Sequence, residues 1–359
     1  MSHRGRAAAC LILALLAVLS CLDVTAARPA PAAPALRGQS GGAAWRSFEH
    51  LQDARRGSHA AGLAEVKGYL ARFGYMQRRA DHDDAFDEHM EAGVRRYQSR
   101  LGLPVTGRLD SATLRRVMSP RCGVGDGHGH GRSTVSVSLS ELAVSRFTFF
   151  DDGEPRWTRP VLTYAISPTA TAGYLPRDAV RAAFRRAFAH WARVIPVEFV
   201  ETDDHDGEAD IKVGFYYGDH GDGDPFDGPG GVLAHAGGPH DGGLHLDAAE
   251  LWTVDLDAEG AYAAIDLESV ATHEIGHVLG LGHSSSAKAV MYPSIGAGER
   301  KVELADDDVE GVQLLYGSNP LFGHKISASP ASASLARSNW LAGSVSLVCV
   351  VLVMLLTHI

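Results

Sequence analysis

The sequence predicts an α+β domain over residues 149–317, preceded by a small all-helical domain over residues 45–126. In residues 45–126, apolar residues recur at the three- and four-residue spacings of amphipathic helices. In residues 149–317, short stretches of alternating apolar and polar residues are separated by helical stretches, which indicates an α+β domain. A third observation, the histidine pattern of residues 273–283, gives this second domain its chemistry.

The N-terminal domain is expected to contain three helices. The apolar stripes of the first two are Leu63, Val66, Leu70 and Phe73, and then Met90, Val94, Tyr97 and Leu101. Asp110 is placed to cap a third, short helix that carries Leu114 and Val117. Residues 102–107 lie between the second and third helices and must form a turn, because they include two glycines and a proline.

The second domain is expected to begin with a strand over residues 162–166. Pro176 then opens a long helix, whose apolar stripe is Val180, Phe184, Phe188, Trp191 and Ile195. Residues 197–200 and 211–216 are typical of strands. Asp306 is expected to cap a final helix that bears Val309, Val312 and Leu315, and the domain is expected to close near residues 316–317.

The stretch from His273 to His283 reads HEIGHVLGLGH. On a helix, His273 and His277 lie one turn apart on the same face, so both imidazoles can reach one ion. Gly280 lets the backbone leave the helix, and the turn brings His283 back as a third nitrogen ligand. Three imidazoles leave one position of a tetrahedral zinc open, which is the arrangement of a catalytic site.

Glu274 lies beside these ligands and is predicted to be the general base. Zinc lowers the pKa of a bound water from about 15.7 to roughly 7, so a carboxylate can take its proton while the metal polarises a carbonyl. HExxH alone also occurs in ordinary amphipathic helices with two solvated histidines. The longer HExxHxxGxxH pattern is far more demanding, so we predict hydrolysis of a peptide bond.

Composition is that of an ordinary globular protein with room for two modest domains in 359 residues. The net charge is −10, and Lys212 is the only Lys or Arg between Glu201 and Asp257. Nothing in this balance suggests a nucleic-acid partner. The acidic segment is either a solvated surface or a source of ligands for hard cations.

The two ends of the chain carry processing signals. Arg4 and Arg6 precede an apolar run over residues 7–22, so residues 1–26 are predicted to be a signal peptide. Residues 27–44 are predicted to be an unstructured leading segment. At the C-terminus, a linker over residues 318–340 precedes an apolar stretch over residues 341–359. We expect a GPI-attachment signal there; a retained transmembrane anchor is the alternative.

Cys122 is the only cysteine between the two apolar ends. It stands in Pro-Arg-Cys-Gly-Val-Gly-Asp, residues 120–126, which resembles the cysteine switch of the matrix metalloproteinases. The preceding helical segment resembles the peptidoglycan-binding-like prodomain of that family. A thiolate can fill the open zinc position and exclude water. The resemblance therefore implies that Cys122 inhibits until the prodomain is removed, with Arg121 and Asp126 paired to hold the loop.

Residues 273–283, with Met291 downstream, resemble the zinc site and Met-turn of the metzincins. The resemblance implies a twisted, mostly parallel five-stranded sheet with three helices, and an apolar floor at Met291 beneath the histidines. No further folded module is expected after residue 317, so the sequence most resembles the plant type of matrix metalloproteinase. Residues 127–148 are predicted to be the linker that an activating protease cuts.

The same resemblance implies structural cations that hold the loops. The expected ligands of a structural zinc are His220, Asp222, His235 and His245. The expected ligands of a calcium ion are Asp227, Gly228, Gly230, Val232, Asp247 and Glu250. Asp210 falls where one ligand of a second calcium site is expected, but Gly243 stands where a carboxylate often occurs, so that site is not claimed.

Substrate contacts are expected along two segments. Leu233 and Ala234 belong to an edge strand that would pair with an extended peptide. Tyr292 and Pro293 would line the adjoining specificity pocket, whose expected ligand is a medium or large apolar side chain.

The resulting prediction is a latent zinc metalloendopeptidase of the secretory pathway, tethered outside the plasma membrane and acting on matrix or cell-surface proteins. Two other functions agree with parts of the sequence. A binding module could keep the zinc site without catalysis, but the intact Glu274 argues against it. A cell-wall enzyme could use the helical region to bind polysaccharide, but the cysteine switch argues for a prodomain.

Overall fold

The computed structural model describes residues 48–79, 81–126, 147–150, 156–258 and 260–321. The predicted signal peptide, leading segment, most of the activation linker and the C-terminal signal lie outside these residues. Up to Pro320 the described residues belong to one compact unit. None of the helices in the described ranges combines the length and apolar character needed to span a membrane.

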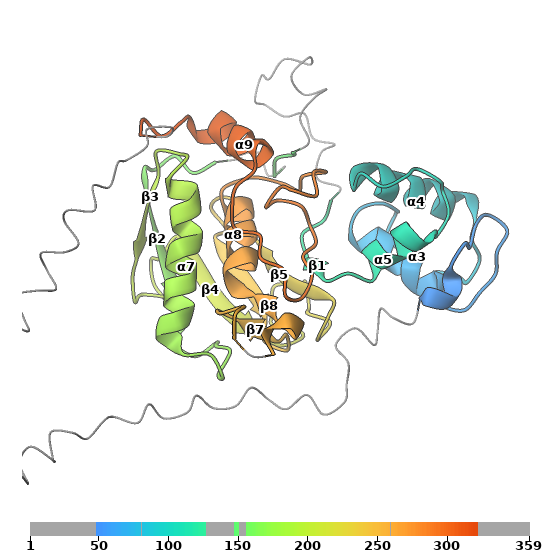
Figure 1. The fold of residues 1–359 in the computed structure, drawn as a ribbon, viewed down its shortest axis with the longest axis horizontal. Helices are drawn as coiled ribbons and strands as arrows, with labels where there is room; N and C mark the ends of the chain where they lie inside the picture. The colour runs from blue at the N-terminus through green and yellow to red at the C-terminus, as the bar shows by residue number, and fades with distance from the viewer. Residues whose placement is uncertain (1–47, 80, 127–146, 151–155, 259, 322–359) are drawn as a thin grey trace, which may run out of the picture. The chain divides into compact units, whose positions relative to one another are not determined.

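The N-terminal domain contains the three predicted helices (Figure 1). They are α3 (Leu63–Arg72), α4 (Glu88–Arg100) and α5 (Ser111–Val117), after a 3₁₀ turn, η1 (Glu49–Leu51). Asp110 caps α5, as predicted, by accepting a hydrogen bond from the Thr113 amide at 2.9 Å. The predicted apolar stripes face one another in a common core.

The second domain, predicted over residues 149–317, is built on a sheet with strand order β1-β5-β6-β4-β2-β3. Only β5 and β6 pair antiparallel. The bounds are β1 (Arg121–Cys122), β2 (Val161–Ile166), β3 (Glu198–Glu201), β4 (Ile211–Tyr216), β5 (Val232–Ala236) and β6 (Gly243–Asp247). The five strands from β2 to β6 are the predicted mostly parallel sheet, and the Cys122 segment adds a sixth. Two short strands, β7 (Trp252–Thr253) and β8 (Ile265–Asp266), form a second parallel pair.

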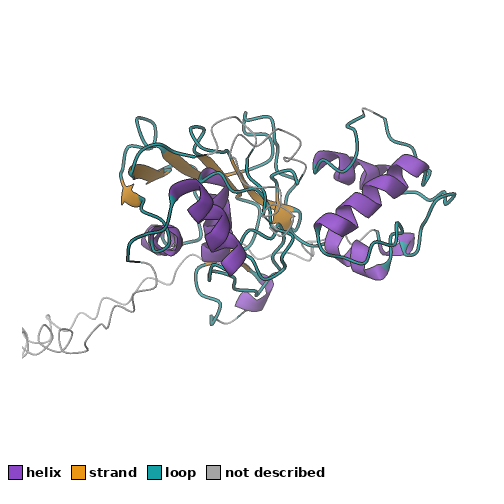
Figure 2. Cartoon of the chain, turned by 90° about the horizontal axis from the view of Figure 1, so that it is seen from above, coloured by secondary structure: helices purple, strands orange, loops and turns teal. Residues whose placement is uncertain are grey.

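Three helices complete the domain, and α7 (Arg177–Ala192) and α8 (Leu267–Val278) pack side by side on the sheet (Figures 1 and 2). Trp191 joins them, because its indole N–H donates to the Thr272 carbonyl at 2.8 Å. The third helix is α9 (Asp306–Tyr316), and a 3₁₀ turn, η2 (Ala261–Ala263), precedes β8.

One capping prediction was wrong. Asp306 is the first residue of α9, and Ala305 occupies the N-cap position. At the N-terminus of α9, the carboxylate of Asp308 accepts a hydrogen bond from the Ala305 amide at 2.8 Å. Three consecutive aspartates start this helix, and only the one that faces inward can reach the backbone groups there.

Candidate metallopeptidase site

Helix α8 places two of the predicted zinc ligands. Asp266 caps its N-terminus by accepting from the Ser269 amide at 3.0 Å. His273 and His277 follow one turn apart, as predicted, and both are buried. After the helix ends, Gly280 adopts a φ of +100°, which favours glycine, and the chain turns to bring His283 to the same point.

The three imidazoles converge through their Nε2 atoms. His277 Nε2 lies 3.1 Å from His273 Nε2 and 3.2 Å from His283 Nε2. Each Nδ1 faces outward and donates a hydrogen bond: His273 to the Val290 carbonyl at 2.7 Å, His277 to the Leu281 carbonyl at 2.7 Å, and His283 to Asp126 at 2.6 Å. Since carbonyls and carboxylates only accept, the Nδ1 atoms carry the protons.

This tautomer leaves three nitrogen lone pairs facing one another. Such an arrangement is repulsive unless a cation lies between them, and neutral imidazoles fixed through Nδ1 are the usual ligands of zinc. Burial lowers the pKa of both His273 and His283, which keeps these imidazoles neutral, although Asp126 opposes the shift at His283. The residues present therefore fit a zinc ion.

Met291 lies under the histidines, as predicted. A methyl group at Gly276, between His273 and His277, would collide with the Met291 sulfur, so helix and Met-turn touch at that glycine. Asp308 fixes the turn by accepting from the amides of Val290 at 2.8 Å and Met291 at 3.0 Å. The floor of the site is thereby tied to the first turn of α9.

Glu274 is fully buried beside the ligands. Neither carboxylate oxygen has a hydrogen-bond partner within the described residues. Burial raises the pKa of Glu274 to about 8, and the neighbouring Cys122 thiol opposes that shift. A buried carboxylate with a raised pKa is poised to exchange a proton with whatever enters the site.

Cys122 occupies the site from the prodomain side. Its sulfur lies 3.4 Å from His277 Nε2, and together with the three imidazoles it forms a buried group whose ligand atoms all lie within 4.8 Å of one another. The cysteine is held between two segments of the catalytic domain. Its amide donates to the Pro293 carbonyl at 2.8 Å, and the Gly123 amide donates to the Ala234 carbonyl at 2.7 Å.

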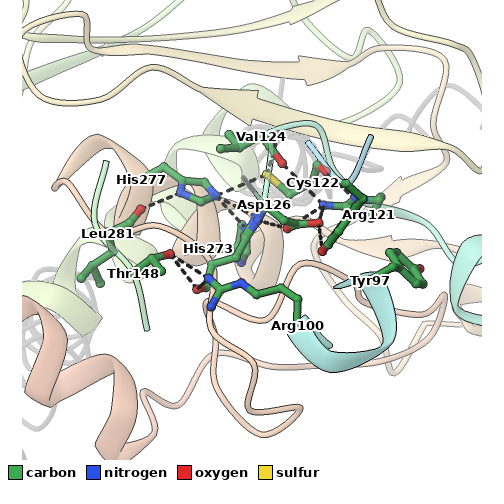
Figure 3. A network of polar contacts seen from close by, with 12 residues as sticks. Tyr97, Arg100, Arg121, Cys122, Val124, Asp126, Thr148, His273, His277 and Leu281 are labelled. Carbon is green, nitrogen blue, oxygen red and sulfur yellow. Dashed lines mark hydrogen bonds and ion pairs between the residues drawn. The ribbon is translucent and has the colours of Figure 1, made fainter. Parts of the chain in front are cut away.

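Arg121 and Asp126 form the predicted pair at 3.0 Å (Figure 3). The Arg121 guanidinium also lies 3.5 Å from the centroid of the Phe73 ring, and the Tyr75 hydroxyl donates to Asp126 at 2.6 Å. Burial alone would raise the pKa of Asp126, but Arg121 and His283 hold it well below its usual range. Asp126 thus joins the switch to a zinc ligand directly, through His283 Nδ1.

Arg100, at the end of α4, makes a second contact with the same ligand. Its guanidinium donates to the His283 carbonyl at 2.5 Å and to the Thr148 hydroxyl at 2.8 Å (Figure 3). Thr148 itself donates to the His283 carbonyl at 3.1 Å. Prodomain residues therefore hold both the ring and the backbone of His283.

The predicted structural zinc ligands also converge. Oδ2 of Asp222 lies 2.8 Å from His220 Nε2, 2.7 Å from His235 Nε2 and 2.9 Å from His245 Nδ1. Burial opposes ionisation of Asp222, yet the Asp224 amide and the rings of His245 and His235 hold its pKa well below the usual value. Four such ligands could hold a closed, structural zinc.

The carboxylates of the predicted calcium site lie close enough to repel one another. Burial, assisted by the charge of Asp227, raises the pKa of Glu250 to about 8 and that of Asp247 to about 6. They are held by backbone amides: Gly230 donates to Glu250 at 2.6 Å, Gly228 to Asp247 at 3.2 Å and Val232 to Asp227 at 2.8 Å. The expected carbonyl ligands from Gly228, Gly230 and Val232 stay a prediction.

Asp210 has other partners. Its carboxylate pairs with Arg159 and accepts from the amide and the hydroxyl of Thr163 at 2.9 and 3.0 Å. These donors account for both oxygens, so the geometry gives no support for a second calcium ion there.

The two segments that are predicted to bind substrate lie on either side of the Cys122 segment. Within the catalytic domain β5, with Leu233 and Ala234, is an edge strand, but in this chain β1 covers that edge in parallel. Tyr292 and Pro293 line a pocket whose wall also includes Glu274 and His273. The Cys122 segment therefore fills the cleft between the predicted strand and the predicted pocket.

Sequence reasoning missed three residues of this region, namely Arg100, Asp308 and Lys301. Arg100 ends an amphipathic helix and gave no sign that it reaches the catalytic domain. Asp308 stands in an acidic run typical of a helix cap. Lys301 lies in a loop without a periodic pattern, so only tertiary structure brings it to the pocket.

A three-histidine site beside a buried glutamate, on a helix packed against a mostly parallel sheet, defines the chain as a zinc-type metallopeptidase with a prodomain. The matrixin family profile matches residues 156–317, and a peptidoglycan binding domain profile matches residues 59–117. The chain belongs to the matrixin family and is a metalloendopeptidase.

The chain is similar to metalloendoproteinases of plants and to a human matrilysin. Metalloendoproteinase 1-MMP of Arabidopsis thaliana is 51% identical over 278 residues, which cover 77% of this chain and 74% of that protein. Metalloendoproteinase 1 of Glycine max is 44% identical over 270 residues, covering 74% and 85%. Matrilysin of Homo sapiens is 37% identical over 267 residues, covering 72% and 88%.

Proposed function

We propose that this protein is an exported, surface-tethered endopeptidase, made as a latent zymogen, that cleaves matrix or cell-surface proteins. The observation that carries the proposal is the convergence of three imidazole Nε2 atoms, Cys122 Sγ and Glu274 at one buried point. Export and tethering rest on the apolar ends of the sequence, which lie outside the described residues.

His273, His277 and His283 would hold the catalytic zinc. When bound, zinc would supply Lewis-acid polarisation of the scissile carbonyl and of the attacking water. Glu274 takes a proton from that water and returns it to the leaving amine. Its burial beside the ligands and its freedom from other hydrogen bonds suit it to both transfers.

Latency follows from the position of Cys122. Its thiol stands where water and substrate would have to enter, and β1 takes the backbone hydrogen bonds of the β5 edge. An activating protease would cut within residues 127–148 and release both contacts together. His220, Asp222, His235 and His245, with the carboxylates near Asp247, would hold structural zinc and calcium that fix the loops beside the cleft.

The test uses the full-length zymogen and a fluorogenic collagen-like peptide, before and after limited proteolysis, with zinc counted in both samples. We expect hydrolysis only after the prodomain is cut, and its loss on adding a zinc chelator. If zinc is bound but no peptide is cleaved after the prodomain is lost, the chain functions instead as a binding module. If the N-terminal domain stays with active material, the latency proposal is wrong.

A further inference from the structure

The cavity beside the catalytic residues has one cationic side chain on its wall. Its lining includes Glu274 and His273 on one side, apolar groups such as Leu233 and Tyr292, and Lys301. The Lys301 ammonium lies 5.3 Å from the centroid of the Tyr292 ring, so it stands over a wall of the cavity itself.

The loop that carries Lys301 is firmly anchored. The Lys301 amide donates to the Ser269 hydroxyl at 2.7 Å, and that hydroxyl donates to Asp266 at 2.5 Å. The neighbouring Arg300 pairs with Glu268 at 2.8 Å, and the Gly298 amide donates to the Ala264 carbonyl at 2.8 Å. The position of Lys301 in the pocket is thus fixed by the N-terminal turn of α8.

The ammonium has no anionic partner at contact distance. Within the described part of the chain, Lys301 makes no ion pair, and its Nζ makes no hydrogen bond. Burial and the nearby Arg116 charge lower the pKa of Lys301, whereas Glu299 and Asp308 oppose the shift from beyond ion-pair distance. The ammonium is partly buried and has no carboxylate to pair with. A hydrogen-bond acceptor on a bound substrate would therefore stabilise it.

The position of Glu274 indicates which substrate residue enters this pocket. In the proposed mechanism Glu274 returns a proton to the leaving amine, and that amine belongs to the residue after the scissile bond. Because Glu274 also lines the pocket, the side chain of that residue is the one nearest its mouth. This step rests on the proposed function.

We propose that Lys301 is a specificity-determining residue of this enzyme. It favours substrates whose residue after the scissile bond has an unbranched side chain ending in an oxygen acceptor, glutamine or glutamate, and it disfavours lysine and arginine there. The apolar walls accept the methylene stem, and the ammonium binds the terminal oxygen. The expected apolar pocket is thereby refined to one with a polar contact on its wall.

The test measures kcat/KM for four peptides that differ only after the scissile bond, where they carry methionine, glutamine, glutamate or lysine. These side chains are similar in length and unbranched. The full-length zymogen is activated by limited proteolysis, and mass spectrometry confirms that the same bond is cleaved. The variants are Lys301→Met and Lys301→Glu. Lys288→Met is the matched control, because Lys288 is exposed on the segment before the Met-turn.

In Lys301→Met we expect the glutamine-to-methionine and glutamate-to-methionine ratios of kcat/KM to fall about tenfold, as when a charge-assisted hydrogen bond is lost. In Lys301→Glu the lysine-to-methionine ratio should rise by a similar factor. Ratios that stay within about threefold of the parent in both variants, as in the control, overturn the inference. If the zinc-loaded parent cleaves none of the four peptides, the proposed function itself fails.

Discussion

In the proposed mechanism, Glu274 both accepts a proton from water and returns it to the leaving amine. Replacing it by glutamine keeps the shape and the three imidazoles. We expect Glu274→Gln to lose about 10²–10⁴-fold in kcat after activation while it retains zinc. Zinc content and peptide turnover on the same sample decide this. A variant that keeps most of its activity would assign the proton transfers to another group.

Glu268 is a buried carboxylate on the same helix, with partners of opposite charge. Burial opposes its ionisation, but the His190 ring, Arg186 and Arg300 lower the pKa of Glu268 to about 2. That value lies below the ordinary 4.5, so ionised Glu268 stabilises the fold above about pH 4.5. The contribution is lost as pH falls from about 4.5 towards 2.

We therefore expect Glu268→Gln to cost on the order of 2–3 kcal/mol of unfolding free energy at pH 7, and less as the pH falls below about 4.5. Denaturant unfolding of parent and variant at a series of pH values measures this difference. Comparing the two at each pH cancels any shared loss of metal. Glu303→Gln is the control, because Glu303 is exposed and lies 4.0 Å from its partner Arg193. A constant difference across this range would refute the assignment.

We expect helix α4 to contribute to the proposed latency through its last residue, Arg100. Removing the Arg100 guanidinium deletes charge-assisted hydrogen bonds to the His283 carbonyl and to Thr148. We expect the uncut Arg100→Ala zymogen to open roughly tenfold more often, raising residual peptide hydrolysis and the rate at which a thiol reagent modifies Cys122. Arg108→Ala, at an exposed position of the same domain, should behave like the parent. Unchanged thiol reactivity would show that Cys122 and Arg121 suffice.

We expect a cation to offset the negative charge of Asp227, Asp247 and Glu250. Without one, the raised pKa values of Asp247 and Glu250 mean that stability falls as pH rises through about 6 and 8. At pH 7.5, calcium at about a hundred times its Kd should stabilise the fold by roughly 2.7 kcal/mol. The increment should shrink near pH 5.5, where protons compete.

Calorimetry with and without calcium measures that increment. Glu250→Gln should lose most of it, whereas Asp257→Asn, at an exposed acidic position nearby, should keep it. Equal increments in both variants would place the calcium ion elsewhere.

At the scale of the whole molecule, the prodomain core is shared with the catalytic domain. Phe226, Val232 and Tyr292 are buried in the same apolar cluster as the stripes of α3 and α4. We expect removal of the prodomain to expose these side chains, lower the thermal midpoint of the catalytic domain and increase binding of an apolar dye. Scanning calorimetry before and after activation tests this. Two independent transitions in the zymogen, each unchanged after cleavage, would contradict the coupling.

Features that depend on residues close together in the chain could be predicted from the sequence. The spacing of His273, His277 and His283 implied three converging nitrogens, because helical geometry and one glycine fix their relation. The apolar stripes of residues 63–101 and 180–195 predicted helices that the structure contains. Apolar residues spaced three and four apart lie on one face when the chain forms an α-helix. Cys122 and its neighbours were recognisable as a short pattern.

Tertiary structure decided what these elements touch. The contacts of Arg100 and Asp126 with His283 join residues 157 to 183 positions apart, and no local pattern encodes such a separation. Lys301 reaches the pocket only because Ser269 and the first turn of α8 anchor its loop. The sequence by itself determined the reaction class, because catalysis here depends on spacing within eleven residues. The contacts on which the proposed latency and specificity rest depend on folding, because they join residues that are far apart in the sequence.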